Sequence, residues 1–383
     1  MSYECSTRRW NLVIPVWGEH YVAIFTQLTL PFLLSPGNLP GLARPDLFTL
    51  RILTGSADVQ ALKNDPAIGR ARERVRVEIV EMPATLPQRL RHLPFFSQIY
   101  AMEIEHARDR EEDVLLWCAD SPIADGGLRS LERRRGEGFR VIFVANYRAE
   151  WQSLSAVFAA RRCARTGGIN FPARELVEVT LRARHEWTRR LEFGDGVVRG
   201  SPGVFWIGPD SNFLITSLML HPIYLDTRVV PQGFAEVSVG SIDLDLPSWL
   251  MCSPKETYTL RDTDEFFAVE ISQEIALPTR ERIAGGNEEF LTAWTHSIAD
   301  FAHDFLAHRP GLSFHLALLG QVIYGHSRDD CKMDPWMAAA AQRLSDKVRE
   351  RLATLPDLAS APPRRDSNMR RMWTRLARCF RGS

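Results

Sequence analysis

Short apolar runs alternate with longer amphipathic segments through the first 150 residues. Runs bounded by polar residues and turns are typical of buried strands, and apolar residues at helical spacing indicate helices packed on a sheet. The predicted strands cover residues 11–16, 47–53, 75–81, 114–119 and 140–145, and the predicted helices cover residues 20–34, 56–68 and 86–108. This alternation predicts an α/β fold around a mostly parallel sheet.

The pattern becomes less regular from about residue 151. It predicts an arginine-rich helix over residues 175–193, strands over 204–207, 213–220, 235–246, 258–260 and 266–271, and helices over 288–308 and 334–355. No repeat, low-complexity tract or linker divides the chain, so we predict one elaborated domain over residues 1–355.

The last segment, residues 356–383, differs in composition. From residue 361 it carries seven arginines against the single acidic residue Asp366, interleaved with apolar residues such as Trp373 and Phe380. As a helix this tail would place an apolar stripe beside arginines, which suits an anionic membrane surface or an acidic partner. As a disordered tail it would be solvated, and both interpretations stay open.

Composition excludes several classes of protein. Of 383 residues, 45% are hydrophobic, and 47 basic residues balance 47 acidic ones, so no overall field attracts nucleic acid. Six scattered cysteines without a Cys-x-x-Cys pair fit reduced thiols. Neither a signal peptide nor a run of about 18 apolar residues is present, so we expect a cytoplasmic protein that does not span a membrane.

Candidate chemistry begins where apolar runs stop. The run from Val114 ends on Asp120, and a similar run from Arg9 ends at Gly18. Ligands of such sheets bind beyond the carboxyl ends of the strands, so one crevice would be lined by both segments. The alternative for Asp120 is a structural one, in which its carboxylate caps a helix beginning near Ala124.

With these features the chain resembles nucleotide-diphospho-sugar transferases of the glycosyltransferase-A fold. The resemblance is carried by the segments 13–18, 53–54 and 115–120. It implies a three-layer, Rossmann-like mixed sheet with a C-terminal helical elaboration. Residues 9–150 would then form the nucleotide-binding half and residues 151–355 the acceptor side.

The resemblance also implies roles for particular residues. Pro15, Trp17 and Glu19 would border the base and ribose of a nucleoside-diphosphate sugar, with Thr54 beside them. Asp120 would be the last aspartate of the Asp-x-Asp motif that binds Mg²⁺ or Mn²⁺. Cys118 stands at the position of the first aspartate, which leaves metal dependence open.

Two residues of a late polar segment extend the expected site. Some enzymes of this fold supply a late histidine to the cation, and His326 would do so here. Arg328, two residues on, would neutralise phosphate.

Further candidates follow other strand-like runs. Asp243 and Asp245 form an Asp-x-Asp triplet that could act near the acceptor, as could His221 with an imidazole that titrates near neutral pH. Asp262 and Asp264 form a second triplet. For the triplets a turn rich in local hydrogen bonds is the alternative, and for His221 it is a buried, backbone-bonded ring.

A rival metal site on one helix face would use His296, Asp300, His303 and Asp304, although no second helix completes it, and a solvated face is favoured. P-loop, dinucleotide-binding and serine hydrolase motifs are missing. We therefore expect a glycosyltransferase that moves a sugar from a nucleoside diphosphate to an unknown acceptor, peripheral to the inner membrane face if the tail binds lipid. A nucleotidyltransferase of similar fold and a non-catalytic binding or scaffold protein are the alternatives.

Overall fold

The computed structural model describes residues 7–192 except 84 and 92, together with 197–198, 203–207, 213–217, 221–237, 246, 250–273, 282–283, 323–325, 339, 342–343, 346 and 350. No helix among these residues is both long enough and apolar enough to cross a bilayer. The predicted helix over 288–308 and the basic tail lie outside the described residues, as does most of the predicted helix over 334–355.

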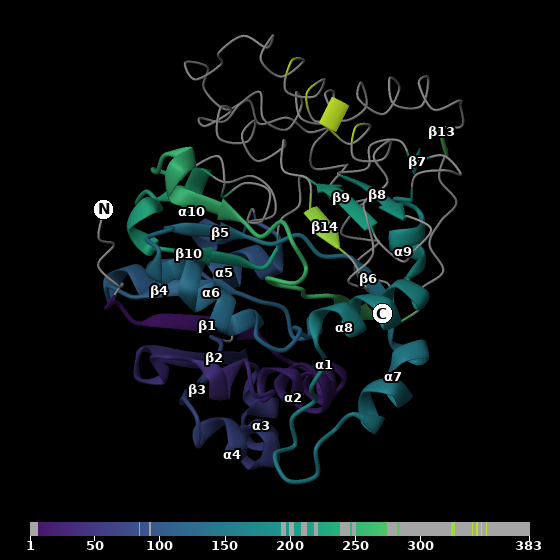
Figure 1. Ribbon diagram of the computed structural model, residues 1–383. Helices are drawn as coiled ribbons and strands as arrows, with labels where there is room; N and C mark the ends of the chain where they lie inside the picture. Colours follow the sequence, from purple (N-terminus) through teal and green to yellow (C-terminus); the bar gives the residue numbers. More distant parts are fainter. Residues whose placement is uncertain are drawn as a thin grey trace.

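Seven described strands form the central sheet, in the order β11-β5-β10-β4-β1-β2-β3 (Figure 1). Their bounds are β1 (Trp10–Pro15), β2 (Phe48–Thr54), β3 (Arg76–Glu81), β4 (Asp113–Leu116), β5 (Val141–Phe143), β10 (Ile223–Leu225) and β11 (Thr257–Thr259). The pairs β1–β2, β1–β4, β2–β3 and β5–β11 are parallel, whereas β10 is antiparallel to β4 and β5. The predicted α/β fold with a mostly parallel sheet is confirmed.

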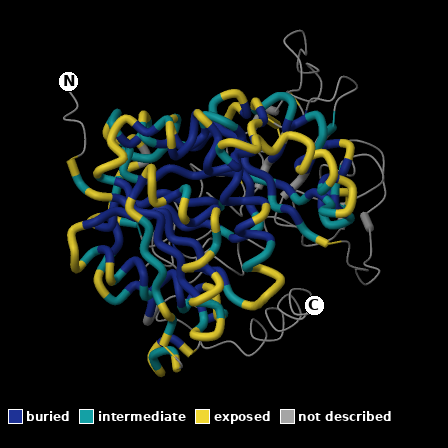
Figure 2. The backbone as a smooth tube through the Cα atoms, turned by 90° about the horizontal axis from the view of Figure 1, so that it is seen from below, coloured by how far each residue is buried: buried dark blue, intermediate teal, exposed yellow. Residues whose placement is uncertain are grey.

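The apolar runs became strands because the sheet is covered on both faces. Every residue of β1, β2 and β4 is buried, as expected for central parallel strands. In β4, Leu116 faces one hydrophobic cluster together with Ile104 of a helix, while Leu115 faces the other cluster together with Leu128 and Leu131. The sheet is therefore the middle of three layers, and its strands form the buried centre of the molecule (Figure 2).

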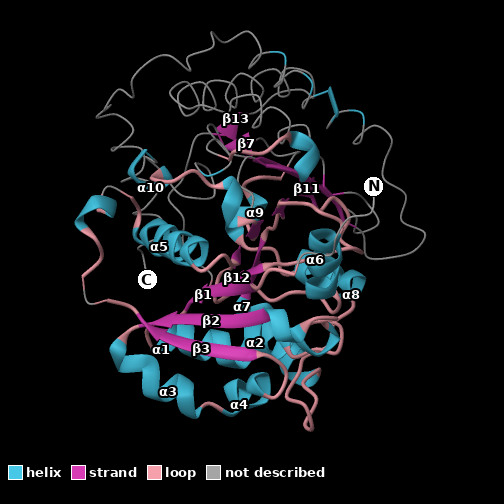
Figure 3. Ribbon diagram, turned by 90° about the vertical axis from the view of Figure 1, so that its left-hand side faces the viewer, coloured by secondary structure: helices cyan, strands magenta, loops and turns pink. Residues whose placement is uncertain are grey.

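The helices of the N-terminal half connect these strands. They are α1 (Glu19–Ile24), the π-helical η1 (Phe25–Thr29), α2 (Leu30–Leu33), η2 (Leu39–Gly41), η3 (Pro45–Leu47), η4 (Ser56–Asp58), α3 (Val59–Asn64), α4 (Pro66–Arg72), η5 (Gln88–Leu90), α5 (Phe95–Asp109) and α6 (Gly127–Gly136). The helices α5 and α6 lie on opposite faces of the sheet (Figure 3).

Further elements follow the first five strands of the central sheet. The helices are α7 (Trp151–Ala160), α8 (Ala173–Arg182), α9 (Glu186–Arg189), η6 (Thr227–Val229), α10 (Phe234–Val237) and η8 (Pro254–Glu256). The smaller sheets pair β6 (Arg148–Glu150) with β12 (Glu270–Ser272), β7 (Val197–Val198) with β13 (Arg282–Ile283), and β9 (Phe213–Ser217) with β8 (Gly203–Ile207) and β14 (Ile323–Gly325).

Three sequence predictions of single elements are wrong, each for a local reason. The helix over 56–68 is divided because Pro66 cannot donate a backbone hydrogen bond, and Asp65 caps α4 through the backbone N–H of Ala67. The helix over 175–193 is interrupted where Arg184 pairs with Ala149 at the edge of β6. Residues 235–237 of the predicted strand over 235–246 belong instead to α10, which follows a turn at Gly233, and residues 238–245 lie outside the described residues.

Two strands depart from the arrangement of a single parallel sheet. The predicted strand over 266–271 is represented by β12, which pairs with β6 outside the central sheet. The strand β10, which was not predicted, inserts antiparallel between β4 and β5. Both differences bring residues from beyond position 220 to the end of the sheet where β1, β2 and β4 finish.

Candidate functional site

Four segments converge at the carboxyl edge of the central sheet. The parallel strands β1, β2 and β4 finish there, at Pro15, Thr54 and Leu116. Because β10 is antiparallel, its first residue, Ile223, pairs with Leu116 at this same edge. His221 thus follows the strand β9 in sequence, as the pattern indicated, but it reaches this edge because it precedes the central strand β10.

The segment after β1 carries an aromatic surface. Trp17 is half-buried, and its ring centroid lies 5.2 Å from that of Phe95 and 4.9 Å from that of Phe96. These two phenylalanines open α5 and remain 44% and 43% exposed. Large exposed apolar rings are unusual for a core, and these rings, tilted against one another, form an aromatic surface on which a planar ligand can pack.

The other residues predicted to bind nucleotide differ in exposure. Pro15 is buried at the end of β1, and Glu19 is exposed as the first residue of α1. Between them Gly18 has a φ of 77° and donates its N–H to Asp58 Oδ2 at 2.7 Å. Thr54 is fully buried, and among the described residues its Oγ1 has no hydrogen-bond partner.

Asp120 lies in the loop that follows β4. Its backbone carbonyl accepts a hydrogen bond from the N–H of Ile271 at 2.8 Å, and the N–H of Val269 donates to Pro122 at 3.2 Å. The chain on either side of Glu270 thus runs alongside Asp120. Burial and, as a smaller effect, the charge of Glu270 raise the pKa of Asp120 to about 7, while Arg148 opposes the shift.

Glu270 and Arg148 form an ion pair next to Asp120. They face each other in the register of β12 and β6, and their side chains are 2.8 Å apart and only 22% and 24% exposed. The backbone of Arg148 is held by Thr188, whose hydroxyl accepts from its N–H at 2.9 Å and donates to its carbonyl at 2.7 Å. The cluster therefore holds two carboxylates and one guanidinium.

His221 completes the cluster on the side of β10. Its Nδ1 lies 3.8 Å from the sulfur of Cys118, and Tyr100, whose hydroxyl donates to the Trp117 carbonyl at 2.7 Å, lies 3.8 Å from the same sulfur. Burial lowers the pKa of His221 to about 4, so the ring is neutral near pH 7. Its Nε2 is buried, and no described residue bonds to it.

Tyr21 of α1 faces the same cluster. The pKa of its hydroxyl is raised by burial first and then by the charges of Asp120, Glu270 and Cys118. The sequence reasoning missed Tyr21 and Arg148, for which no local pattern exists. For Glu270 a signal was present, because it is a charged residue inside the apolar run from Phe266 to Ile271.

Two structural alternatives can now be decided. Asp120 does not cap a helix, because α6 begins at Gly127 and Gly126 occupies its N-cap position. The triplet at Asp262 is a turn: Asp262 Oδ1 accepts from the N–H of Asp264 at 2.8 Å, and Asp264 pairs with Arg174. The remaining candidates lie outside the described residues: Asp243, Asp245, His296, Asp300, His303, Asp304, His326 and Arg328.

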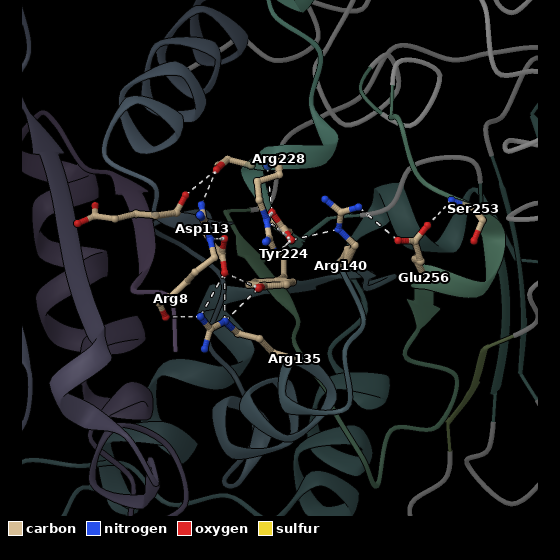
Figure 4. Close-up of polar contacts among 11 residues, drawn as sticks. Arg8, Asp113, Arg135, Arg140, Tyr224, Arg228, Ser253 and Glu256 are labelled. Atoms are coloured by element: carbon tan, nitrogen blue, oxygen red, sulfur yellow. Dashed lines mark hydrogen bonds and ion pairs between the residues drawn. The ribbon is translucent and has the colours of Figure 1, made fainter. Parts of the chain in front are cut away.

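At the amino edge of the sheet, charged side chains form a network of hydrogen bonds and ion pairs (Figure 4). Asp113, the first residue of β4, accepts hydrogen bonds from Arg8 at 2.8 Å, Arg135 at 3.2 Å and Tyr224 at 2.9 Å. Its side chain is 1% exposed. A carboxylate this deeply buried and bonded by three side chains, with Arg135 also donating from Nε at 3.3 Å, is not accessible to a ligand, so this network is structural.

The donor chemistry of the carboxyl edge fits a hard divalent cation only in part. Asp120 and Glu270 offer carboxylate oxygens, but within the described ranges no group of three His, Cys, Asp or Glu side chains could hold a metal ion. Mg²⁺ is commonly bound by one or two carboxylates, with substrate phosphate oxygens and water as the other ligands. The residues present fit a cation shared with a phosphorylated ligand.

Comparisons with known proteins do not place the chain in a family. No protein-family model matches it, and no curated protein is significantly similar to it in sequence. Its function must therefore be argued from the residues that the fold brings together at the carboxyl edge.

Proposed function

We propose that this protein transfers a sugar from a nucleoside diphosphate to an acceptor at the carboxyl edge of the central sheet. One observation carries the proposal: the segments after β1, β2 and β4 meet there and bring an aromatic surface, a buried hydroxyl and the Asp120 carboxyl to one edge. Ligands of α/β sheets bind at this edge. The mixed sheet, with β10 antiparallel among parallel strands, supports a glycosyltransferase-A type of domain.

The nucleoside would bind beside β1 and β2. Its base stacks on the surface formed by Trp17, Phe95 and Phe96, which is open on one side. The Thr54 hydroxyl, which lacks a partner among the described residues, donates to the ribose or accepts from it. An unsatisfied buried hydroxyl is costly, so a ligand that pairs with it gains affinity and selectivity.

The diphosphate would lie toward β4 and β10. Asp120 would hold a Mg²⁺ or Mn²⁺ ion, which when bound supplies positive charge that stabilises the departing diphosphate. His221, neutral near pH 7, donates a hydrogen bond from Nε2 to a phosphate oxygen and so orients the leaving group. Phe95 and Phe96 would shield one side of the bound nucleotide from water.

The first test is a thermal-shift titration with UDP, GDP, CDP and their sugars, each with and without Mn²⁺. A ligand at a hundred times its Kd stabilises the native state by about 2.7 kcal/mol. We expect a Mn²⁺-dependent shift for one base, and its loss in Trp17→Ala. The matched control is Trp151→Ala, because Trp151 is also a half-buried tryptophan but lies on α7.

Product analysis separates the alternatives. Release of a nucleoside diphosphate from the sugar donor supports glycosyl transfer, whereas release of pyrophosphate from a nucleoside triphosphate would identify a nucleotidyltransferase. No thermal shift with any nucleotide would contradict the proposal and leave a binding or scaffold protein of this fold.

A further inference from the structure

Cys118 occupies the place where an Asp-x-Asp motif would carry its first carboxylate. Its sulfur lies 3.8 Å from both the Tyr100 hydroxyl and Nδ1 of His221. A thiol in this setting is not the oxygen ligand that Mg²⁺ prefers. If the site holds a hard cation, a second carboxylate must therefore come from another segment of the chain.

Glu270 is placed to supply it. Backbone hydrogen bonds join Ile271 to Asp120 at 2.8 Å and Val269 to Pro122 at 3.2 Å, and Ile123 forms an antiparallel bridge with Ala268. Val269 and Ile271 are buried in the core, so the alternation along the strand turns Glu270 away from the core. Arg148, 2.8 Å away, orients the Glu270 side chain through their ion pair.

A second observation also points to a ligand at this position. His221 Nε2 is buried without a partner among the described residues, and Glu270 is the charged side chain whose field acts on this ring. A buried polar atom left unpaired in a native fold calls for a partner that the protein alone does not supply. Water or phosphate oxygens around a cation would be such a partner.

We propose that Glu270 is the second protein carboxylate of a divalent-cation site with Asp120, in place of the oxygen ligand that Cys118 does not provide. This inference rests on the proposed function, since diphosphate oxygens complete the coordination. Because only two protein carboxylates take part, the site binds the cation weakly alone and tightly when a diphosphate is present.

The test measures protein-bound Mn²⁺ by equilibrium dialysis, with Mn²⁺ alone, with inorganic pyrophosphate and with UDP. Dialysis separates protein-bound Mn²⁺ from Mn²⁺ held by free pyrophosphate. We expect pyrophosphate to tighten Mn²⁺ binding to the unaltered protein about tenfold or more. Glu270→Gln and Asp120→Asn should each weaken that binding by about tenfold or more. Glu175→Gln, which breaks the surface ion pair with Arg161, should not change it.

A second variant distinguishes a role of Glu270 as a cation ligand from a purely structural role in the ion pair. Arg148→Gln breaks the same ion pair as Glu270→Gln but keeps the carboxylate, so it should retain Mn²⁺ binding. Equal losses in both variants would overturn the proposal, as would unchanged binding in Glu270→Gln or no Mn²⁺ binding with pyrophosphate. Failure of the proposed function is distinct, because it would leave Mn²⁺–pyrophosphate binding intact while no nucleotide binds selectively.

Discussion

Asp120 and His221 are two neighbouring groups whose charged forms are both disfavoured by burial. In the folded chain the pKa of Asp120 is about 7, against an ordinary value of 3.8. Between these pH values the native state binds more protons than the unfolded state. The free energy of unfolding therefore falls as the pH rises from about 4 to about 7. His221, with its pKa lowered to about 4, has the opposite effect between about pH 4 and 6.5.

At the residue scale we therefore predict that Asp120→Asn stabilises the cation-free protein at alkaline pH. At pH 8 the substitution removes a desolvated charge, and the gain should be on the order of 2 kcal/mol once solvent screening is considered. At pH 4.5, where Asp120 is protonated in the folded chain, the advantage of the variant should be much smaller. Urea denaturation in the presence of a chelator, at both pH values, measures the difference in free energy of unfolding between the variant and the original protein. The His221 contribution is common to both proteins and cancels. A variant less stable at pH 8 would contradict the assignment.

At the scale of elements, close backbone contacts and paired charges hold the layers together. The loop before η2 meets the start of α6 at Gly37, whose N–H donates to Asp125 Oδ1. A Cβ on Gly37 would lie 2.6 Å from the backbone nitrogen of Gly126. Asp113 joins β4 to β10 and α6 through buried hydrogen bonds. Asp113 begins β4, whose other end leads into the candidate site, whereas Gly37 packs against the loop that follows this strand.

Gly37→Ala should destabilise the protein by about 2–4 kcal/mol, because backbone atoms cannot yield to the added methyl group as a flexible side chain would. Gly69→Ala is the control. Gly69 lies inside α4, where an added methyl group would have no other atom within 4 Å, so alanine should be neutral or stabilise by about 0.5–1 kcal/mol. Thermal and urea unfolding of both variants measures the contrast; equal effects would refute the steric argument.

Asp113→Ala should cost about 3–5 kcal/mol, because it leaves the buried guanidinium of Arg135 without its carboxylate. Asp46→Ala, which breaks the exposed ion pair with Arg44, should leave stability unchanged. Nucleotide affinity of the folded fraction of Asp113→Ala should match that of the unaltered protein. Lost affinity with retained stability would move the site to the amino edge.

At the scale of the whole molecule, the two ends of the sheet have different roles. The amino edge is closed by paired charges, although Trp10 Nε1 lacks a partner there among the described residues. The carboxyl edge leaves the rings of Phe95 and Phe96 exposed, and within the described ranges Thr54 Oγ1 and His221 Nε2 lack partners there. The buried charge network and the proposed ligand site thus lie at opposite ends of the sheet.

This division predicts where a bound nucleotide slows hydrogen exchange. With nucleotide and Mn²⁺, amides in residues 16–24 and 117–124 should exchange more slowly, because these segments would border the ligand in the proposed site. Residues 108–113 and 133–140, at the amino edge, should be unaffected. Hydrogen-exchange mass spectrometry makes the comparison, and protection confined to the amino edge would exclude the proposed site.

The sequence by itself determined the local elements and the point where chemistry could begin. The runs at β1, β2 and β4 were predictable because burial on both faces selects near-continuous apolar residues, and Asp120 was recognisable as the polar residue that ends such a run. The α/β alternation followed from the same local pattern, since each element carries its own period.

Only the tertiary structure decided which residues meet Asp120. Glu270 and Arg148 are brought beside it by pairing of β6 with β12 and by backbone bonds between segments about 150 residues apart, and no local period encodes such pairing. His221 reaches the carboxyl edge because β10 runs antiparallel, a direction that the apolar pattern leaves open. Strand order and direction depend on the free energy of packing the whole sheet. For this reason only the tertiary structure determines which residues lie together at the candidate site.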